Sequence, residues 1–448
     1  MTLSRKYWKN CKPLSEKKKV LILSYYWPPS GGSGVQRWLK MQKYLSDFGW
    51  QPVVYTTENG EMPAIDPSLE KDIRPDTIVI KKPIWEPYLI YKRLTGRKRD
   101  ERMGAGFLTE KKKSSKIENL AVWIRGNLFI PDARKYWIKP SVRYLQKYLR
   151  ENPVDAIIST GPPHSMHLIA LALKKKLNIP WIADFRDPWT KIDFYDKLRL
   201  SNRADRKHRR LEKEVIQTAN IVVTVSWQWS DEFVKMGAVR TEVVTNGFDP
   251  DDIKLVNSEL SKEFTITHIG SMNKDRNPQT LWTVFKELCD ENPTFRAHLK
   301  LQFIGKTDYQ VFENLNALEL NDIVRKVDYM PHEEVISEMS KSQLLLLAIN
   351  DTPNVAGVIP GKLFEYMAVK RPILAVGPPE ADAGKIIIES KTGEVINFKD
   401  HEGLKKAILF YYNSYLAKNL SISSTESIDK YSRKNLAENY VLLLNEIS

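Results

Sequence analysis

Cysteine is scarce in this chain of 448 residues. Cys11 and Cys289 are the only two, and they lie far apart with no histidine cluster beside them. A disulfide framework needs several cysteines, and a structural zinc site needs four clustered ligands. Both are therefore excluded as organising features. The one acidic string of the D-x-D kind, at 249–251, is interpreted as a turn and helix start, so we expect no bound metal.

Long apolar runs are also missing. The longest, 344–349, has the length of a strand, well short of the roughly 18 residues that span a bilayer. The first residues are basic and polar and do not resemble a secretory signal. No short-period repeat or low-complexity segment is visible. We expect a cytoplasmic location, and the charge described next adds the inner membrane face as an alternative.

Acidic residues are outnumbered, with 55 Asp and Glu against 69 Lys and Arg, for a net charge of +14. Such an excess indicates an anionic partner, whether phosphates, nucleic acid or a membrane surface. Much of it lies in two stretches, 91–116 and 199–213. The first is predicted to be a loop or insert. Both are interpreted either as solvated basic surface or as a contact with an anionic membrane or acceptor.

Apolar content of 42% and charged content of 28% are typical of globular proteins. Short apolar runs alternate with helical periodicity, and this alternation predicts the fold. Predicted strands occupy 20–25, 51–56, 155–159, 180–185, 221–225, 243–245, 264–269, 299–304, 344–349 and 372–376. Predicted helices occupy 35–48, 167–176, 206–218, 278–290, 361–369, 382–389 and 428–447. The pattern restarts near 250–262, which indicates two doubly wound α/β domains with ligands at the carboxyl ends of their strands.

A glycine-rich loop follows the first predicted strand. Gly31 and Gly32 lie just before a helix, where a backbone can approach a ligand closely. Their spacing does not match the dinucleotide-binding fingerprint G-x-G-x-x-G. The alternative is a tight turn between strand and helix.

Two later loops of the first half carry ionisable side chains. His164 and His167 follow the strand at 155–159, where either could act as an acid, a base or a hydrogen-bond donor. The alternative for each is a capping or packed histidine. Asp184 and Asp187 flank Arg186 after the next strand. They could form a buried structural network or orient a polar substrate, and the sequence does not decide between these.

The second half has two candidate anion sites. Gly270 ends the strand at 264–269, and Lys274 and Arg276 follow before a helix, whose N-terminus attracts phosphate. The second site lies at the start of the predicted helix 361–369.

Gly361 and Lys362 begin the predicted helix 361–369, and Glu365 lies three positions later on the same face. A lysine here can bind a diphosphate, and a glutamate can accept hydrogen bonds from two ribose hydroxyls. The alternative is an exposed ion pair within the helix. The nearby buried strand and glycine loop favour a binding site.

Taken together, these segments resemble the glycosyltransferases of the GT-B fold. The chain is similar to family 4, the retaining enzymes, and to their polysaccharide-biosynthesis branch. The resemblance is carried by 24–40, 130–137, 159–189, 243–249 and 359–382. It implies two Rossmann-like domains facing a central cleft. Residues 1–255 would bind the acceptor and include the insert near 91–116, residues 256–425 would bind the donor, and residues 426–448 would form a helix that crosses back.

The resemblance also assigns residues. Gly31 and Gly32 match the glycine loop that lines the cleft, and the neighbourhood of His164 matches a loop with a functional histidine. Glu365 matches the second of two glutamates eight positions apart, the ribose ligand. Gly357 stands where the first glutamate is expected. At the diphosphate clamp, Ser271 replaces an arginine, while Arg276 lies near the family's lysine.

The implied activity is transfer of a sugar from a UDP- or GDP-sugar to an acceptor hydroxyl, with retention and without a metal or other cofactor. The acceptor would be a glycan or a lipid-linked glycan of a cell-surface polysaccharide, reached by peripheral association with an anionic membrane. We name His164 and Asp187 as catalytic candidates. Gly31, Gly32, Gly270, Arg276, Gly361, Lys362 and Glu365 are the donor-binding candidates.

Three alternatives remain. A nucleotide-sugar epimerase or a phosphorylase could use the same fold. A catalytically silent binder is suggested by Gly357. A nucleic-acid-binding protein would fit the charge, but no binding motif is recognisable and the aromatic residues do not interleave with the basic runs. We therefore expect no nucleic-acid partner.

Overall fold

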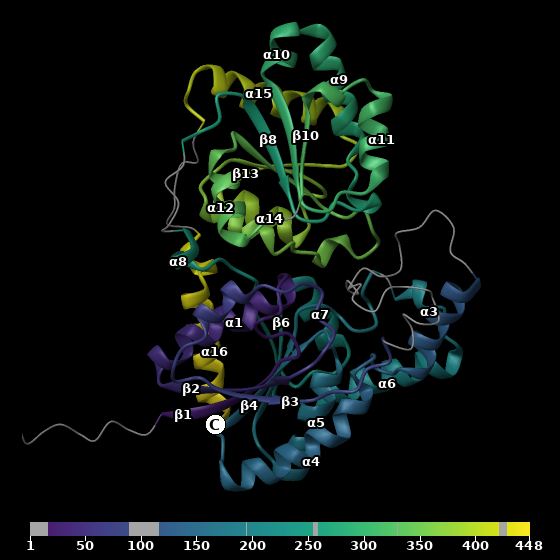
Figure 1. The fold of residues 1–448 in the computed structure, drawn as a ribbon, viewed down its shortest axis with the longest axis vertical. Helices are drawn as coiled ribbons and strands as arrows, with labels where there is room; N and C mark the ends of the chain where they lie inside the picture. The colour runs from purple at the N-terminus through teal and green to yellow at the C-terminus, as the bar shows by residue number, and fades with distance from the viewer. Residues whose placement is uncertain (1–16, 89–115, 194, 254–258, 329, 421–427) are drawn as a thin grey trace, which may run out of the picture.

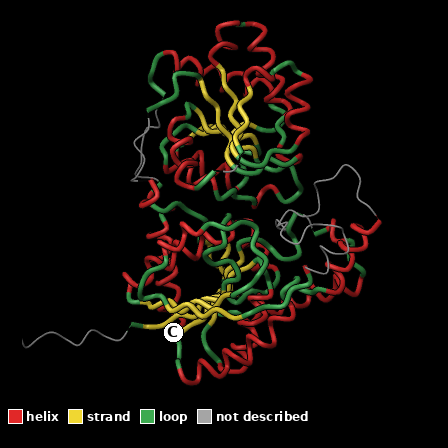
Figure 2. Tube along the Cα trace, viewed as in Figure 1, coloured by secondary structure: helices red, strands yellow, loops and turns green. Residues whose placement is uncertain are grey.

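The chain folds into two α/β halves, each built on one parallel sheet (Figure 1). The computed structural model describes residues 17–88, 116–193, 195–253, 259–328, 330–420 and 428–448. Figure 2 shows strands at the centre of each half, with helices around them. The predicted basic insert near 91–116 lies outside the described residues except at its last position.

The first sheet has seven parallel strands among the described residues, in the order β3-β2-β1-β4-β5-β6-β7. β1 is an inner strand of this sheet, where Val20 pairs with Pro52 of β2 on one side and Ala156 of β4 on the other. The strands are β1 (Lys18–Leu23), β2 (Trp50–Thr57), β3 (Ile78–Lys82), β4 (Ala156–Gly161), β5 (Trp181–Phe185), β6 (Ile221–Thr224) and β7 (Thr241–Val243).

The second sheet has six parallel strands among the described residues, in the order β10-β9-β8-β11-β12-β13. They are β8 (Phe264–Ile269), β9 (Leu299–Ile304), β10 (Val324–Val327), β11 (Leu344–Ala348), β12 (Ile373–Val376) and β13 (Gly393–Ile396). Both orders start at an inner strand and wind outward in two directions. This topology confirms the predicted class, two doubly wound Rossmann-like domains.

Helices cover both faces of each sheet. In the first half they are α1 (Ser33–Leu45), α3 (Lys116–Leu128), α4 (Lys135–Glu151), α5 (Ser165–Leu177), α6 (Asn202–Thr218) and α7 (Trp227–Lys235). A short helix, α8 (Pro250–Ile253), follows the first sheet. The second half has α9 (Gln279–Glu291), α10 (Pro293–His298), α11 (Tyr309–Ala317), α12 (His332–Lys341), α13 (Lys362–Ala368), α14 (Asp382–Ser390) and α15 (His401–Leu416).

The side chains of β1 alternate between the two faces of the first sheet, and helices bury both faces. Leu21 and Leu23 enter one apolar core, while Val20 and Ile22 enter the core on the opposite face. Because strand side chains alternate, a strand covered on both faces needs apolar residues at every position. Among the described residues, no helix combines the length and apolar character that crossing a bilayer requires.

The last helix, α16 (Arg433–Ile447), packs on the first half of the molecule, beside α1 (Figure 1). Leu436, Tyr440 and Leu444 share a core with Val20, and the Tyr440 ring meets that of Trp38 at 4.9 Å between centroids. The chain end is therefore part of the first hydrophobic core, although it follows the second sheet in sequence.

The loops at the carboxyl ends of the two sheets face each other. Ser226, after β6, donates a hydrogen bond of 2.7 Å to Asp382 at the start of α14. Asn350, after β11, donates one of 3.2 Å to Asp193, after β5. The strand-end loops of both domains thus meet at one interface, and strand-end loops are where doubly wound sheets bind their ligands.

The acidic string at 249–251 lies between the halves and begins α8, as predicted. Asp249 accepts a hydrogen bond of 2.6 Å from Tyr44 and one of 3.2 Å from Lys43, which also pairs with Asp251 at 2.6 Å. These carboxylates tie the linker to α1.

Candidate functional site

Lys362 starts α13 and reaches the end of β8. Its ammonium donates to Nε2 of His268 at 3.0 Å and to the carbonyl oxygen of Ile269 at 2.7 Å. His268 is buried, and its Nδ1 lies 3.1 Å from the carbonyl oxygen of Leu346, so the ring donates there and accepts from lysine. The alternative interpretation, an exposed ion pair between Lys362 and Glu365, is not found among the contacts of the described residues.

Arg276 lies beside this lysine, in a 3-10 turn after β8. Its Nε donates to the side-chain oxygen of Asn350 at 2.5 Å, and its Nη1 donates to the carbonyl oxygen of Ser271 at 3.1 Å. Asn350 in turn donates to Asp193 of the first domain. The guanidinium is therefore oriented by a hydrogen-bond relay that crosses the domain interface.

These two cations have no carboxylate bonded to them among the described residues. Burial, together with the positive charge of Arg276, holds the pKa of Lys362 well below its usual range. Burial also lowers the pKa of Arg276, against the more distant negative charge of Asp193. Two desolvated cations that repel each other create a strong local preference for an anion.

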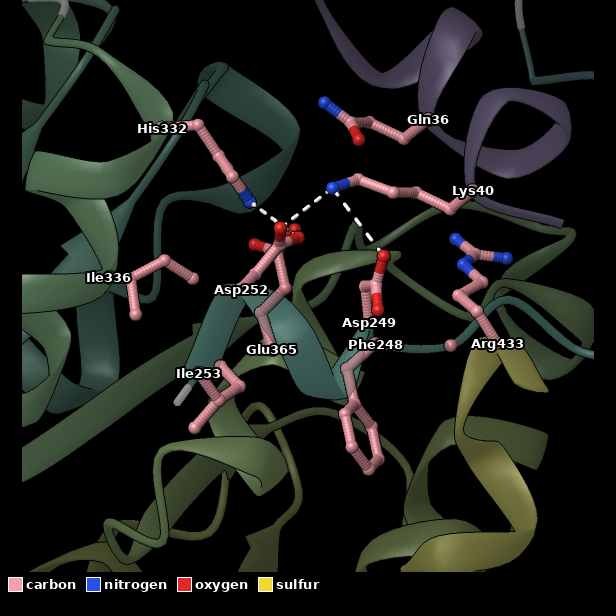
Figure 3. A pocket seen from close by; sticks show the side chains of 11 residues that line it. Gln36, Lys40, Phe248, Asp249, Asp252, Ile253, His332, Ile336, Glu365 and Arg433 are labelled. Carbon is pink, nitrogen blue, oxygen red and sulfur yellow. Dashed lines mark hydrogen bonds and ion pairs between the residues drawn. The ribbon is translucent and has the colours of Figure 1, made fainter. Parts of the chain in front are cut away.

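Glu365 lies one turn beyond Lys362 and lines a pocket between the two halves of the molecule (Figure 3). Burial raises its pKa, against the positive charge of His332. Its carboxylate forms no hydrogen bond or ion pair with other described residues, although its backbone oxygen accepts from the N–H of Val369. The pocket is also lined by Gln36, Lys40, Asp252, His332 and Arg433.

Arg433 brings α16 into the same pocket. Its side chain is 6% exposed, and its Nη1 has no hydrogen-bond partner among the described residues. Burial and the charge of Arg37 lower its pKa to about 9. An unpaired donor thus lies in the same pocket as the unpaired carboxylate of Glu365, so the pocket retains free hydrogen-bonding capacity.

The glycine loop of the first domain shows two different environments. The N–H of Gly31 donates to the carbonyl oxygen of Ala64 at 2.9 Å, and a Cβ here would lie 3.1 Å from that of Asp66. This matches the tight-turn interpretation. Gly32 is exposed and left-handed, with φ of 88°, at the N-cap of α1. Of the two, Gly32 faces solvent.

His164 caps the start of α5 and lies flat against Trp189, with ring centroids 4.9 Å apart and planes 2° from parallel. Its Nδ1 has no hydrogen-bond partner among the described residues. Burial holds its pKa well below the usual range, so the ring is neutral at pH 7. A neutral imidazole can donate or accept a hydrogen bond but does not serve as a cation.

His167 is packed, as its alternative interpretation held. It is fully buried, stacks on Phe185 at 4.3 Å, and its Nδ1 lies 2.8 Å from the hydroxyl of Ser159. Burial lowers its pKa to about 3.

The two carboxylates around Arg186 have separate environments. Asp184 is fully buried and bonds Arg37 through both oxygens, at 3.0 and 3.1 Å, as well as Trp38, Thr160 and Tyr440. Burial alone would raise its pKa, but Arg37 and these hydrogen bonds lower it. Asp184 is therefore a structural anchor that joins β5, α1 and α16.

Asp187 is reached by solvent, yet protein atoms crowd around it. This partial desolvation raises its pKa, against the opposing charge of Arg186. Arg186 itself donates to the carbonyl oxygens of Gly34 at 2.8 Å and Pro162 at 2.5 Å. Arg186 thus holds the loop after β1 and the loop after β4 together. Asp187 has no such structural role and remains available to a ligand.

The three glycines of the second domain that the sequence analysis singles out have different surroundings. Gly270 has φ of 84°, the left-handed region, and turns the chain after β8. Gly361 is exposed at the start of α13, with no atom near the position of a Cβ. At Gly357 a Cβ would lie 2.6 Å from the ring of Trp229 on α7. The position of the expected first glutamate has no room for a side chain.

Sequence reasoning missed three residues that shape the anion site: His268, Asn350 and Asp193. His268 lies near the end of β8, Asn350 lies two residues after β11, and Asp193 lies in the segment that follows β5. Only the sheet order and the contact of the two domains bring them together, so no local spacing could have revealed them. The polar residue at the end of an apolar strand, His268, is the one available signal.

Comparison with known proteins agrees with this geometry. The family model described as Glycosyltransferase Family 4 matches residues 106–252, and that described as Glycosyl transferases group 1 matches residues 251–434. No curated protein sequence matches the chain significantly.

Solved structures resemble the whole chain at low identity. Sucrose-phosphate synthase from Thermosynechococcus elongatus has a TM-score of 0.64 at 13% identity, covering 96% of this chain and 99% of that one. A TarM mutant from S. aureus, in complex with fondaparinux, alpha-GlcNAc-glycerol and UDP, has a TM-score of 0.60 at 13% identity. The match covers 96% of this chain and 100% of that one. A putative UDP-N-acetylglucosamine 2-epimerase from Listeria monocytogenes has 0.52 at 13%, covering 96% of each.

The fold and the two family matches together define the class. The chain is a glycosyltransferase with two Rossmann-like domains in the GT-B arrangement. It is similar to the family 4 glycosyltransferases: the Family 4 model matches part of the first half, and the group 1 model matches the second half directly after it.

Proposed function

We propose that this enzyme transfers a sugar from a UDP- or GDP-sugar to a hydroxyl of a glycan or lipid-linked glycan, with retention of configuration and without a metal. The observation that carries the proposal is the half-buried pair of cations, Arg276 and Lys362, whose hydrogen bonds go to His268, Asn350 and backbone carbonyls and to no carboxylate among the described residues. A diphosphate supplies the missing negative charge. The TarM complex with UDP shows such a donor product on a similar fold.

In this proposal the second domain binds the donor. Arg276 and Lys362 contact the diphosphate, and the exposed Gly361 leaves room for it at the start of α13. Glu365 accepts hydrogen bonds from the ribose hydroxyls, for which its carboxylate has free lone pairs. Gly270 provides the left-handed turn that clears the space next to β8.

The chemistry separates a diphosphate from an oxocarbenium-like sugar. The bond from the anomeric carbon to the diphosphate oxygen breaks, and a bond to the acceptor oxygen forms on the same face. Fixed positive charges stabilise the leaving diphosphate without rearranging during the step. The acceptor proton passes to the departing diphosphate oxygen, so no protein nucleophile is required.

The first domain supplies the acceptor side. We propose that Asp187 accepts a hydrogen bond from the acceptor hydroxyl. Neutral His164, whose buried Nδ1 has no hydrogen-bond partner among the described residues, is the second catalytic candidate on this side. Gly32, at the N-terminus of α1, lines the same edge, with Gly31 shaping the turn behind it. Contact between the domains excludes water, which limits hydrolysis of the donor.

A thermal-shift screen across nucleoside monophosphates, diphosphates and diphosphate sugars tests the donor class. Mass action predicts about 2.7 kcal/mol of stabilisation at a hundredfold excess over Kd. We expect diphosphates and their sugars to stabilise the enzyme, and monophosphates to do so far less. Isomerised nucleotide sugar formed without an acceptor would instead indicate an epimerase.

A further inference from the structure

The pocket between the two halves of the molecule is lined by ionisable side chains, most of which have partners (Figure 3). Asp252 pairs with Nζ of Lys40 at 2.6 Å and with Nε2 of His332 at 3.4 Å. Asp249 accepts hydrogen bonds of 2.6 and 3.2 Å from side chains of α1. Two lining residues have no such ion pair or side-chain hydrogen bond with other described residues. They are Glu365 and Arg433.

Arg433 is the first residue of α16, and its guanidinium is buried. The side chain is 6% exposed, and its Nη1 has no hydrogen-bond partner among the described residues. Its backbone N–H donates to the carbonyl oxygen of Phe248 at 2.8 Å, which fixes the start of the helix to the linker. Buried charges are normally paired, because desolvation of a charge is costly. A buried guanidinium with a free N–H therefore indicates a ligand group that accepts a hydrogen bond.

Glu365 offers the complementary group in the same pocket. Burial raises the pKa of its carboxyl, against the positive charges of His332 and Arg433. The charge of Glu365 in turn acts to raise the pKa of Arg433. The two groups are thus close enough for their charges to interact, although no ion pair joins them. A ligand group between them has to donate to the carboxylate and accept from the guanidinium.

We propose that Arg433 is a further donor-binding residue, which binds the ribose of the nucleotide together with Glu365. A hydroxyl donates one hydrogen bond and accepts others, so one ribose hydroxyl can donate to Glu365 while it accepts from Nη1 of Arg433. A phosphate fits this position less well, because it only accepts hydrogen bonds and its charge would be repelled by the carboxylate.

The inference rests on the proposed function, in which Glu365 binds the ribose and Lys362 the diphosphate. It adds a residue from the other side of the pocket, because α16 shares the core of the first domain through Leu436, Tyr440 and Leu444. Glu365 belongs to α13 of the second domain. One ribose would therefore connect the two domains, and donor binding would favour the arrangement in which they are in contact.

Isothermal titration with UDP, GDP and their 2′-deoxy and 3′-deoxy forms tests the assignment. We expect wild type to bind one ribonucleotide more tightly than its deoxy forms. Arg433→Met should weaken binding of that ribonucleotide about tenfold or more, and binding of at least one deoxy form much less. Arg433→Lys retains a donor and should recover part of the loss. Lys434→Met is the control, since Lys434 is the next residue of α16 and is exposed.

A second measurement separates ligand binding from a structural role. Arg433→Met removes a buried charge without a bonded partner, so the melting temperature without nucleotide should not fall below that of Lys434→Met. A marked fall would assign the guanidinium a structural role and contradict the inference.

The titrations also separate this inference from the proposed function. If Glu365→Gln loses the preference for ribose but Arg433→Met retains it, the role of Arg433 is overturned and the proposed ribose ligand stands. Equal weakening of ribonucleotide and deoxy forms by Arg433→Met also overturns it. If wild type binds neither UDP nor GDP, or does not distinguish either from its deoxy forms, the proposed donor site itself is wrong.

Discussion

Asp184 and Asp187 lie three positions apart, yet their surroundings give them different roles. Asp184 is fully buried and holds Arg37, while Asp187 is open to solvent near the strand-end loops. The sequence presents them as a symmetric pair around Arg186. Only burial and hydrogen-bond partners distinguish an anchor from a ligand-facing group, and neither can be read from three positions of sequence.

Substitution should separate the two roles. Asp184→Asn leaves the buried guanidinium of Arg37 without its counter-charge, so we expect a loss of about 3–5 kcal/mol in the free energy of unfolding. Asp187→Asn should leave stability within about 0.5 kcal/mol of wild type and reduce sugar transfer. Urea unfolding and a transfer assay measure the two effects. Equal stability losses in both variants would contradict the assignment.

The buried histidines predict how stability depends on pH. The pKa values of His164, His167 and His268 are lowered by burial, so these rings stay neutral in the folded protein while the unfolded chain protonates near pH 6.5. Protons then bind preferentially to the unfolded state, and stability falls as pH decreases. From pH 7.5 to 6.0 these three together should remove about 2 kcal/mol. His208, whose pKa burial also lowers, adds to the fall.

His332 acts in the opposite direction. Burial alone would lower its pKa, but its contact with Asp252 and the charge of Glu365 raise it. Its stabilising contribution is complete below the unfolded pKa and is lost as pH rises through the folded one. His332→Gln should therefore steepen the fall in urea midpoint between pH 7.5 and 6.0. A wild-type midpoint that does not change over this interval would refute the account of the buried rings.

At the scale of elements, the loop between β11 and α13 contacts α7 of the other domain through Gly357. Gly357→Ala should cost about 1–3 kcal/mol, because a methyl group 2.6 Å from Trp229 forces the domains apart. Gly361→Ala is the matched control, since its backbone is helical, with φ of −57°, and its Cβ would meet nothing. Thermal unfolding should show the first variant destabilised and the second unchanged. Equal melting temperatures would mean that the contact is not tight.

The strands show which elements sequence can predict. Every inner strand of both sheets was predicted, because a strand covered on both faces reads as an apolar run. The edge strands β3, β10 and β13 were missed, and β7 was placed two residues late. Edge strands are half-exposed and carry residues such as Lys81, Arg325 and Glu394, so their composition resembles that of a loop.

The candidate site residues, like the strands, could be predicted from sequence only in part. Lys362 and Arg276 could be proposed from sequence because each lies in a loop or helix start after a predicted strand. Their closeness could not, since it depends on sheet order and on Asn350 reaching across the interface. The resemblance already indicates that Gly357 replaces the first glutamate, but only the structure gives the reason, which is that Trp229 fills the space of a side chain there.

At the scale of the whole molecule, the net charge of +14 serves more than one purpose. Arg276 and Lys362 concentrate a small part of it between the domains, where a diphosphate would bind. A larger part lies on and around α3 and α4, on the flank of the first domain (Figure 1). The excess charge, which by itself indicates phosphates, nucleic acid or a membrane surface, is thus divided between the proposed donor site and the exposed flank of the first domain.

The central claim is that Arg276 and Lys362 bind a nucleotide diphosphate. Isothermal titration of wild type with UDP, UMP, GDP and GMP, repeated with Lys362→Met, tests it most directly, with exposed Lys385→Met as control. We predict that one diphosphate binds wild type far more tightly than its monophosphate. Lys362→Met should weaken diphosphate binding on the order of 10- to 100-fold and leave the monophosphate nearly unaffected. Equal affinities for diphosphate and monophosphate, or undiminished diphosphate binding by Lys362→Met, would contradict the account.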